Sequence, residues 1–293
     1  MNLETDWVLD EEPMGSKAKK WLQLPGSHER WLFKYPRMHG AIQSGEHWAE
    51  KIAAEQAALL GVPHATVELA RFDGTIGSAS LRFPELDEDG VELVHGNDVL
   101  AGLLLDYDPS KRRFEQTEHT LENVLDAVER LIPDQPGREE AIVQLGGYVL
   151  LDALILNTDR HNENWGLFKR TTPGTAERHW VAPTFDHASS LGRELVEPRL
   201  SRMIAAPDGV ARYAAKGRGG VFLRGQTAVS PLDLCAVAQR LRPEAIAPWT
   251  HRLAQIGLPA VLAVVDKVPN ELMSGPAKTF ARNVLTYTYG KLV

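Results

Sequence analysis

The sequence holds a single cysteine, Cys235, among its 293 residues. One thiol excludes an intrachain disulfide and any zinc site built from several cysteines, and it leaves only the question of a thiol nucleophile. Cys235 lies in the helical pattern Leu-Asp-Leu-Cys-Ala-Val-Ala, and free cysteine is among the most buried residue types. We therefore expect Cys235 to fill the core.

Long apolar runs, a secretory leader and an excess of basic residues are also missing. The first residues, Met-Asn-Leu-Glu-Thr-Asp, are acidic, and the apolar runs are too short or too charged to span a bilayer. We expect a cytoplasmic protein without a membrane partner. The formal net charge of -7 argues against direct nucleic-acid binding, because dedicated nucleic-acid binders usually carry a strongly basic domain.

Several common catalytic motifs are absent as well. The chain has no P-loop, no glycine-rich dinucleotide turn, no nucleophile elbow and no metalloprotease helix motif, so hydrolase and Rossmann interpretations lose their main support. The triplet His161-Asn162-Glu163 imitates the His-x-Glu motif of zinc deaminases, but the Pro-Cys-x-x-Cys partner of that motif cannot exist with one cysteine.

What the chain does contain predicts an α+β fold of two lobes. Apolar residues make up 43% of the sequence, which suffices for a sizeable core in one large domain or two lobes. Apolar periodicity predicts one early helix at 45–60 and strands at 21–24, 30–36, 66–70 and 77–83. The acidic, turn-rich stretch 84–90 predicts a linker. We expect a small β-rich N-lobe, residues 1–84, and a larger, mainly helical C-lobe, residues 85–293.

The second part of the chain is dominated by helical patterns. Apolar residues recur at three- and four-residue intervals in seven further segments, 95–105, 120–131, 138–156, 232–241, 248–256, 259–268 and 277–289. Residues 1–12 are expected to form a loosely held lead-in. Residues 193–222, rich in arginine, lysine and glycine, are expected to be irregular.

The densest chemistry lies between Leu154 and Leu167. An apolar run ends at Leu156, a polar segment covers 157–164, and a strand-like piece follows. Asp159 and Asn164 are five positions apart, which is the spacing of the protein-kinase catalytic loop. In that loop the aspartate accepts the proton of the attacking hydroxyl and the asparagine holds a magnesium ion. The segment therefore predicts a catalytic loop.

Candidate nucleotide-binding residues precede this loop. Lys34, on a predicted strand, would neutralise phosphates, and a loop containing Gly15 and Ser16 would lie over them. On the helix 45–60, Glu50 is the preferred partner for Lys34 and Glu46 is the alternative. Without the later loop, an ordinary surface hairpin with a solvated lysine would be the better explanation of the loop and Lys34. Solvated surface charge would explain Glu50 or Glu46 equally well.

Two further positions are assigned by their order along the chain. Arg82 and Phe83 fall where a hinge between the lobes would contact adenine. Asp186 follows a strand-like stretch that can pair with 165–168, and such a hairpin would bring Asp186 beside Asn164. Two oxygen ligands, completed by phosphate oxygens and water, suit Mg²⁺.

The neighbours of Asp159 in the loop receive less specific predictions. His161 is expected to hold the loop by packing or hydrogen bonding rather than to bind a metal. Arg160 can either tether the loop or face a phosphate, and the sequence does not choose between the two.

The motif Asn-Thr-Asp-Arg-His-x-x-Asn-Trp at 157–165, followed by Ala-Pro-Thr-Phe-Asp at 182–186, resembles HipA-like serine/threonine kinases. These are bacterial enzymes often encoded as toxins beside an antitoxin. The Asp-Arg-His-x-x-Asn core is also similar to that of phosphoinositide kinases. The match extends upstream through 31–36, 46–61 and 95–98, and it covers most of the chain to about Gly192.

The resemblance implies a role for five residues: Asp159 as the catalytic residue, Asn164 and Asp186 as magnesium ligands, Lys34 as the ATP-phosphate lysine, and Ser16 as an autophosphorylation site. The loop at 15–19 departs from the family's phosphate loop, and the chain resembles the shorter relatives that lack an N-terminal subdomain. We expect a kinase that uses ATP and Mg²⁺ to phosphorylate a protein Ser/Thr hydroxyl, with an antitoxin as partner. A small-molecule or lipid kinase and a nucleotide-binding pseudokinase that acts as an interaction module are the alternatives.

Overall fold

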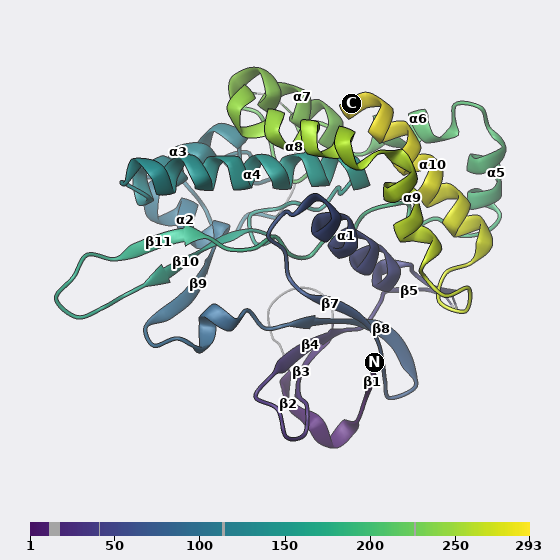
Figure 1. Ribbon diagram of the computed structural model, residues 1–293, viewed down its shortest axis with the longest axis horizontal. Helices are drawn as coiled ribbons and strands as arrows, with labels where there is room; N and C mark the ends of the chain where they lie inside the picture. The colour runs from purple at the N-terminus through teal and green to yellow at the C-terminus, as the bar shows by residue number, and fades with distance from the viewer. Residues whose placement is uncertain (12–17, 41, 113–114, 226) are drawn as a thin grey trace.

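The computed structural model describes residues 1–11, 18–40, 42–112, 115–225 and 227–293. Its strands and helices are segregated, with a curled sheet at one end and a layer of helices at the other (Figure 1). A small apolar cluster lies on the sheet, and a much larger one lies among the helices. The expected α+β class, with a small β-rich part and a larger helical part, is confirmed. The division between residues 84 and 85 stays a prediction.

The first sheet has six strands in the order β1-β7-β8-β4-β3-β2. Their bounds are β1 (Asn2–Leu3), β2 (Val8–Glu11), β3 (Lys19–Gln23), β4 (Arg30–Lys34), β7 (Val67–Phe72) and β8 (Thr75–Leu81). On β4, Phe33 is fully buried and the next residue, Lys34, faces the opposite side, because side chains alternate along a strand. Lys34 pairs in register with Ser78 on β8. The alternation therefore turns the lysine away from the small core.

Helix α1 (Glu46–Leu60) connects the sheet to the helical part. It packs against β7 and β8 on one side and against α4, α8 and α9 on the other, and it lies between the two layers in Figure 1. The helix ends at Gly61, whose φ of 74° lets its N–H reach the carbonyls of the last turn, as glycine at this position commonly does. A carboxylate on α1 can therefore act on residues of both layers.

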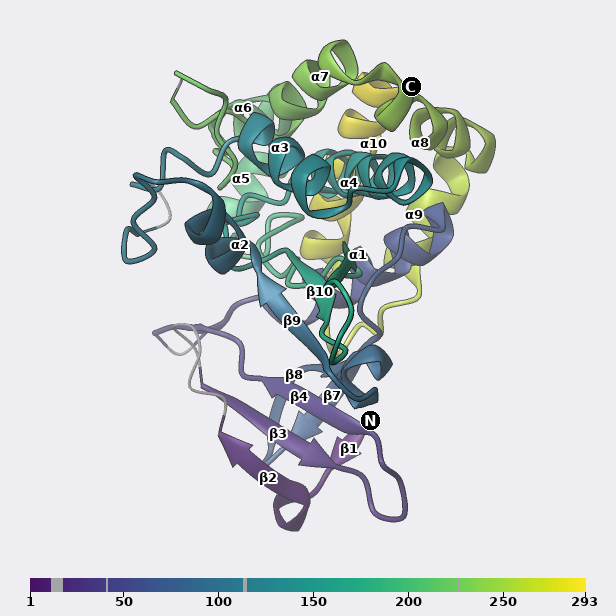
Figure 2. The same cartoon turned by 90° about the vertical axis from the view of Figure 1, so that its left-hand side faces the viewer.

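A second sheet of three strands runs between the layers (Figure 2). It consists of β9 (Val91–His95), β10 (Gly166–Arg170) and β11 (Arg178–Val181), in the order β11-β10-β9, and all neighbours are antiparallel. The pairing of Leu167 with Val181 confirms the predicted hairpin. The 3-10 helix η2 (Pro84–Asp87) leads into β9, and a short hairpin of β5 (Met38–His39) and β6 (Ile42–Gln43) precedes α1.

The helical part is built around the long helix α4 (Gln135–Ile155). Its other helices are α2 (Gly96–Leu103), α3 (Leu121–Leu131), α5 (Arg199–Ala205), α6 (Gly209–Lys216), α7 (Pro231–Leu241), α8 (Pro243–Ile256), α9 (Leu258–Asp266) and α10 (Gly275–Leu292). The side chains of Thr120, Asp134 and Ser230 accept a backbone N–H at the starts of α3, α4 and α7, which satisfies an otherwise unpaired donor.

Two expectations about irregular segments are wrong. Residues 1–11, the described part of the expected lead-in 1–12, are not loose, because β1 pairs in parallel with β7 and β2 pairs with β3, and Leu3 is buried in the small core. Residues 193–222 contain the helices α5 and α6. Leu200, Met203 and Ile204 follow helical spacing there, although basic residues and glycine dominate the composition. The strand β9 was also not predicted.

Cys235 on α7 is 3% exposed, and burial raises the pKa of its thiol to about 12. Its assignment to the core is confirmed. Within the described part of the chain, no helix combines the length and the apolar character that a membrane span requires.

Candidate active site

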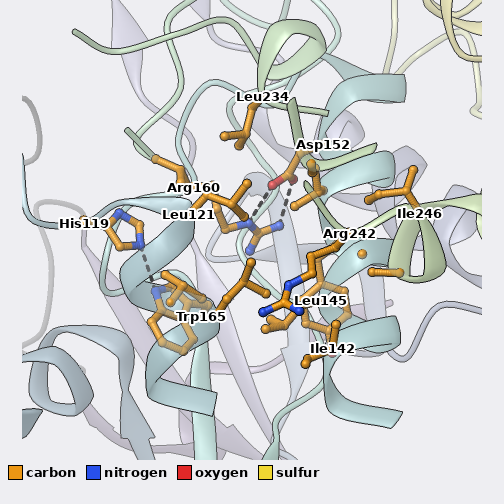
Figure 3. A pocket seen from close by; sticks show the side chains of 18 residues that line it. His119, Leu121, Ile142, Leu145, Asp152, Arg160, Trp165, Leu234, Arg242 and Ile246 are labelled. Atoms are coloured by element: carbon orange, nitrogen blue, oxygen red, sulfur yellow. Dashed lines mark hydrogen bonds and ion pairs between the residues drawn. The ribbon is translucent and has the colours of Figure 1, made fainter. Parts of the chain in front are cut away.

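The segment after α4 is fixed by a buried ion pair. Arg160 Nε lies 2.8 Å from Asp152 Oδ2, and Arg160 Nη2 lies 2.8 Å from Asp152 Oδ1, with both side chains less than one-tenth exposed. Figure 3 shows this two-pronged contact between α4 and the loop. Two parallel hydrogen bonds between guanidinium and carboxylate fix orientation as well as distance. Arg160 is therefore the tether of the loop, which settles a question that the sequence left open.

The remaining guanidinium nitrogen of Arg160 joins two parts of the site. Its Nη1 donates to the carbonyl of Asn164 and, at 3.1 Å, to the carbonyl of Phe185. Burial acts to lower the pKa of Arg160, but the carboxylate of Asp152 raises it above its usual value. One buried cation thus connects the loop 157–164 to the residue that precedes Asp186.

Asp159 lies on this loop with its side chain 26% exposed. Ser189 Oγ donates to Asp159 Oδ2 at 3.0 Å, and His161 Nε2 lies 4.0 Å from Asp159 Oδ1. Asn164 Nδ2 donates to the Asp159 carbonyl at 2.7 Å. The structure thus places Asp159 and Asn164 side by side. His161 accepts the Glu163 N–H at 3.2 Å within the loop.

Lys34 and Asp186 meet at the boundary of the two layers. Lys34 Nζ lies 3.2 Å from Asp186 Oδ1. Burial acts to lower the pKa of Lys34, but the carboxylates of Asp186 and Glu50 raise it above its usual value, so the ammonium stays protonated at neutral pH. Asp186 has a φ of 59°, an uncommon backbone conformation for a non-glycine residue, and such residues are concentrated at functional sites.

The two candidate carboxylates on α1 have different surroundings. Glu46 accepts from Arg193 Nη1 at 2.7 Å and from the Arg37 N–H at 2.8 Å. Glu50 is 1% exposed, its Oε1 lies 3.7 Å from His187 Nδ1, and its Oε2 has no hydrogen-bond partner within the described ranges. Burial acts to raise the pKa of Glu50, but the charge of Lys34 brings it below its usual value. Glu50 is therefore a buried charge that Lys34 helps to neutralise.

The predicted hinge residues lie where the first sheet ends. Arg82 Nη2 donates to the Leu86 carbonyl at 2.8 Å, and its Nη1 pairs with Asp87. The ring of Phe83 meets the ring of Phe185 edge to face, with centroids 6.0 Å apart. Phe83 thus contacts the residue that precedes Asp186. The Arg82 guanidinium is instead bound by Leu86 and Asp87 of η2. Gly15 and Ser16 lie outside the described residues.

A buried histidine supports the loop from the opposite side. Trp165 Nε1 donates to His119 Nε2 at 2.9 Å (Figure 3), and His119 Nδ1 lies 2.7 Å from the Gly220 carbonyl. Because indole nitrogen only donates, His119 must be neutral with its proton on Nδ1. Burial lowers the pKa of His119 to about 4. His119 thereby links the residue after Asn164 to the segment around Gly220.

Two cavities border these residues. One of about 60 Å³ lies between α3, α4, α7 and α8 and is lined mainly by apolar side chains, with Asp152 and Arg160 in its wall (Figure 3). The other, of about 830 Å³, opens beside the loop and is lined by Thr158 and Ser189 together with residues of α5 and α6. Ser189, which lines the larger cavity, hydrogen-bonds to Asp159, so this cavity extends to a direct neighbour of the predicted catalytic carboxylate.

Sequence reasoning missed several residues of this arrangement. Asp152 is the one charged residue in the apolar run 148–156. Because a charge on a buried helix face usually has a partner, the sequence could have indicated that Asp152 forms a buried ion pair. His119, His187 and Ser189 carry no such signal, because their contacts with Trp165, Glu50 and Asp159 join positions that are distant in sequence.

The oxygen atoms present limit how a metal can be held. Among the described residues, no group of three or more His, Cys, Asp or Glu side chains could hold a metal ion. Asp186 offers a carboxylate, and Asn164 offers Oδ1 because its Nδ2 already donates to Asp159. A Mg²⁺ ion at these two residues would need phosphate oxygens and water to complete its coordination.

The model of the HipA-like C-terminal domain family matches residues 12–217, and no curated protein matches the sequence. Among solved structures, the Helicobacter pylori proinflammatory kinase CtkA is similar with a TM-score of 0.76 and 18% identity, covering 99% of this chain and 95% of that chain. HipA of the Shewanella oneidensis MR-1 toxin–antitoxin system, solved with HipB and its operator DNA, is similar with a TM-score of 0.59 and 16% identity, covering 97% of this chain and 64% of that chain. At these identities the likeness shows a shared kinase-like fold.

Proposed function

This chain belongs to the HipA-like C-terminal domain family, and from its kinase-like fold we propose that it transfers the γ-phosphate of ATP, with Mg²⁺, to a protein Ser/Thr hydroxyl. The observation that carries the proposal is the meeting of Lys34 and Asp186 at 3.2 Å, next to a loop that holds Asp159 at the edge of a large cavity. Phosphoryl transfer requires mainly positioning and charge neutralisation, which this arrangement can supply.

Each residue has a distinct part in the proposed reaction. Asp159 would accept the proton of the attacking hydroxyl, and the hydrogen bond from Ser189 orients its carboxylate. Lys34 would neutralise phosphate charge, because its pKa is raised and it remains an ammonium. Asp186 and Asn164 would hold Mg²⁺, for which oxygen ligands are suited. The Mg²⁺ held by these two residues would supply positive charge that offsets the charge developing on the phosphate.

The tether formed by Arg160 gives these residues a common frame. It fixes the loop on α4 and the carbonyl of Phe185 at the same time, so Asp159 and Asp186 are positioned by one buried cation. Such preorganisation matters because a displacement of about 1 Å can cost on the order of a hundredfold in rate.

Partner and context also belong to the proposal. Because the similar Shewanella structure is of a toxin–antitoxin system that contains HipA and HipB, we propose that this chain acts as a toxin with an antitoxin protein as partner. The resemblance of the sequence to the family supports Ser16 as an autophosphorylation site. We place the activity in the cytoplasm, where ATP is available.

Transfer of labelled phosphate from ATP tests the proposed function. Purified protein with Mg²⁺ and γ-labelled ATP should label itself or a lysate protein on Ser or Thr, and chelation of Mg²⁺ should abolish labelling. Asp159→Ala and Asp186→Ala should each abolish transfer. Asp126→Asn, an exposed position on α3, serves as control and should transfer at the wild-type rate.

Two outcomes would contradict the proposal. Unchanged labelling in Asp159→Ala would remove the assigned catalytic residue. Binding of Mg-ATP by the wild-type protein without transfer to any protein would instead favour a nucleotide-binding interaction module, and transfer to a small molecule alone would favour a metabolite or lipid kinase.

A further inference from the structure

The large cavity beside the catalytic loop is basic, although the chain as a whole carries a formal charge of -7. Five cationic side chains line the cavity, namely Arg193, Arg199, Arg212, Lys216 and Arg218. Glu194 is the single carboxylate among the described lining residues. A concave surface of one charge sign concentrates ligands of the opposite sign. The cavity is therefore a local exception to the acidic character of the chain.

The ion pairs formed around this cavity do not cancel its charge. Arg193 is paired with Glu46 at 2.7 Å. The pair of Arg212 with Asp208 at 3.3 Å is more than half exposed on both sides, and exposed pairs of this kind contribute little. Glu194 accepts from the Tyr213 hydroxyl at 3.4 Å. With Glu46, Asp208 and Asp159, which Ser189 contacts, counted beside Glu194, the cations outnumber the carboxylates five to four among the described residues.

The basic segment that follows α6 is packed directly against the catalytic loop. A Cβ on Gly217 would lie 3.2 Å from Thr158 Cγ2, and a Cβ on Gly220 would lie 2.8 Å from the Arg160 carbonyl group. The Gly220 carbonyl in turn accepts from His119. The two glycines permit this close approach because they lack side chains. The backbone around Lys216 and Arg218 therefore lies against the loop that carries Asp159.

We propose that this cavity binds an acidic segment of the protein substrate, so that the acceptor Ser or Thr is flanked by Asp, Glu or phosphorylated residues. The inference rests on the proposed function, because it places the substrate segment next to Asp159. Ser189 and Thr158 form the end of the cavity near the catalytic carboxylate, and α5 and α6 form the basic part. An acceptor residue at Ser189 would thus have its neighbours among Lys216, Arg218 and Arg199.

The lining favours a polypeptide over a nucleic acid. Proteins that bind single-stranded nucleic acids stack the bases on exposed aromatic rings. The one aromatic residue among the described lining residues is Tyr213, and its ring packs edge to face against Phe280 with centroids 5.2 Å apart. The cavity therefore offers charge without a stacking surface, which fits carboxylates along a peptide.

Direct binding tests the inference without requiring catalysis. The probe is a short fluorescein-labelled peptide in which Ala replaces the acceptor and Asp and Glu flank it, and its partner probe carries Lys at every acidic position. Fluorescence anisotropy with the full chain should show that the acidic peptide binds at least about tenfold more tightly. The preference should weaken as salt is added, because the screening length falls from about 10 Å at 0.1 M to about 3 Å at 1 M.

Charge reversal in the cavity supplies the matched comparison. The double variant Lys216→Glu with Arg199→Glu should lose the acidic preference, whereas Arg240→Glu, an exposed residue of α7 outside the cavity, should bind both peptides like the wild type. Equal melting temperatures by circular dichroism show that the variants are folded. A single Lys216→Glu variant should retain part of the acidic preference, between the wild type and the double variant.

The results separate this inference from the proposed function. Equal binding of both peptides, or wild-type binding by the double variant, would overturn the inference even if the protein is an active kinase. Preferential binding without phosphate transfer to the Ser form of the acidic peptide would retain the inference and contradict the kinase assignment. Tighter binding of a single-stranded oligonucleotide than of the acidic peptide, lost in the double variant, would replace the peptide by a nucleic acid.

Discussion

At the scale of single residues, the buried pair of Asp152 and Arg160 is the strongest determinant of the site. Asp152→Asn keeps the shape of the side chain but leaves the guanidinium buried without its counter-charge. Removing one member of a buried ion pair typically costs about 3 to 5 kcal/mol. We expect a loss of about 3 kcal/mol in the free energy of unfolding, measured by urea denaturation, together with loss of phosphate transfer.

The double variant Asp152→Leu with Arg160→Met separates stability from positioning. It removes both charges, and apolar replacements of a buried pair are often neutral for stability. Its free energy of unfolding should return close to the wild-type value. Transfer should stay low, because the carbonyls of Asn164 and Phe185 have lost their common donor. Recovery of both properties would show that the tether does not position the site.

His119 gives a pH-dependent prediction at the same scale. Its pKa is lowered from 6.5 to about 4 in the folded chain, so the unfolded state binds more protons between these values and stability falls as the pH falls through that range. Above pH 6.5 this group contributes no such loss. In His119→Asn the loss is absent, so the stability difference between wild type and variant should shrink by about 2 kcal/mol from pH 7.5 to pH 5.

Unfolding curves at the two pH values measure this difference, and Asn retains a donor for the Gly220 carbonyl. A stability difference that does not change with pH would contradict a neutral, buried His119.

The sequence predicts the residues proposed for the chemistry better than it predicts the residues that hold them in place. Asp159, Asn164 and Asp186 could be found because their spacing follows the chemistry of phosphoryl transfer. The partners of these residues could not, since contacts such as Ser189 to Asp159 join positions 30 residues apart and depend on the tertiary fold. The predicted roles of all these residues, Asp159, Asn164 and Asp186 as well as Lys34, Glu50, Arg82 and Phe83, stay predictions.

At the scale of elements, the sequence predicted the helices that have a clear apolar period but did not predict the strands β1 and β9. The helices α1, α3, α4 and α7 match their predicted segments closely, since periodicity is a local signal. Strands β1 and β9 exist through partners far along the chain, β7 and β10, and their two and five residues carry little pattern of their own. Pairing of distant segments is decided by tertiary packing, which a local reading cannot supply.

The packing of α4 on α8 gives a prediction at this scale. A Cβ on Gly146 would lie 2.1 Å from the Ala245 carbonyl oxygen of α8, so Gly146→Ala must push the helices apart. Overpacking of this kind typically costs about 1 to 3 kcal/mol. Gly102→Ala on α2 is the matched control, because nothing lies within 4 Å of its added Cβ.

Alanine favours a helix over glycine by up to about 1 kcal/mol, so Gly102→Ala should be neutral or stabilising. Thermal unfolding of both variants measures the contrast, and equal melting temperatures would show that α4 and α8 can separate without cost.

At the scale of the whole molecule, α1 holds the sheet and the site segment in one arrangement. The Gly45 N–H donates to the Arg193 carbonyl at 2.8 Å, Glu46 pairs with the Arg193 side chain, and Glu50 lies beside His187. Residues 186–193 are thus attached to α1 at three points, while Lys34 reaches Asp186 from the sheet. The position of α1 therefore sets the distance between the sheet and residues 186–193, which include the proposed metal ligand Asp186.

The two carboxylates of α1 should accordingly differ in function. In the proposed complex with ATP and Mg²⁺, Asp186 would bind the metal, and Glu50 Oε2, which has no hydrogen-bond partner among the described residues, would be the acceptor available to Lys34. Glu50→Gln should therefore raise KM for ATP by about tenfold, equivalent to about 1.4 kcal/mol. Glu46→Gln weakens the contact to Arg193, so it should lower the melting temperature while KM for ATP changes less. Steady-state kinetics and calorimetry on both variants distinguish the two roles, and a larger change of KM in Glu46→Gln would assign the lysine partner to Glu46 instead.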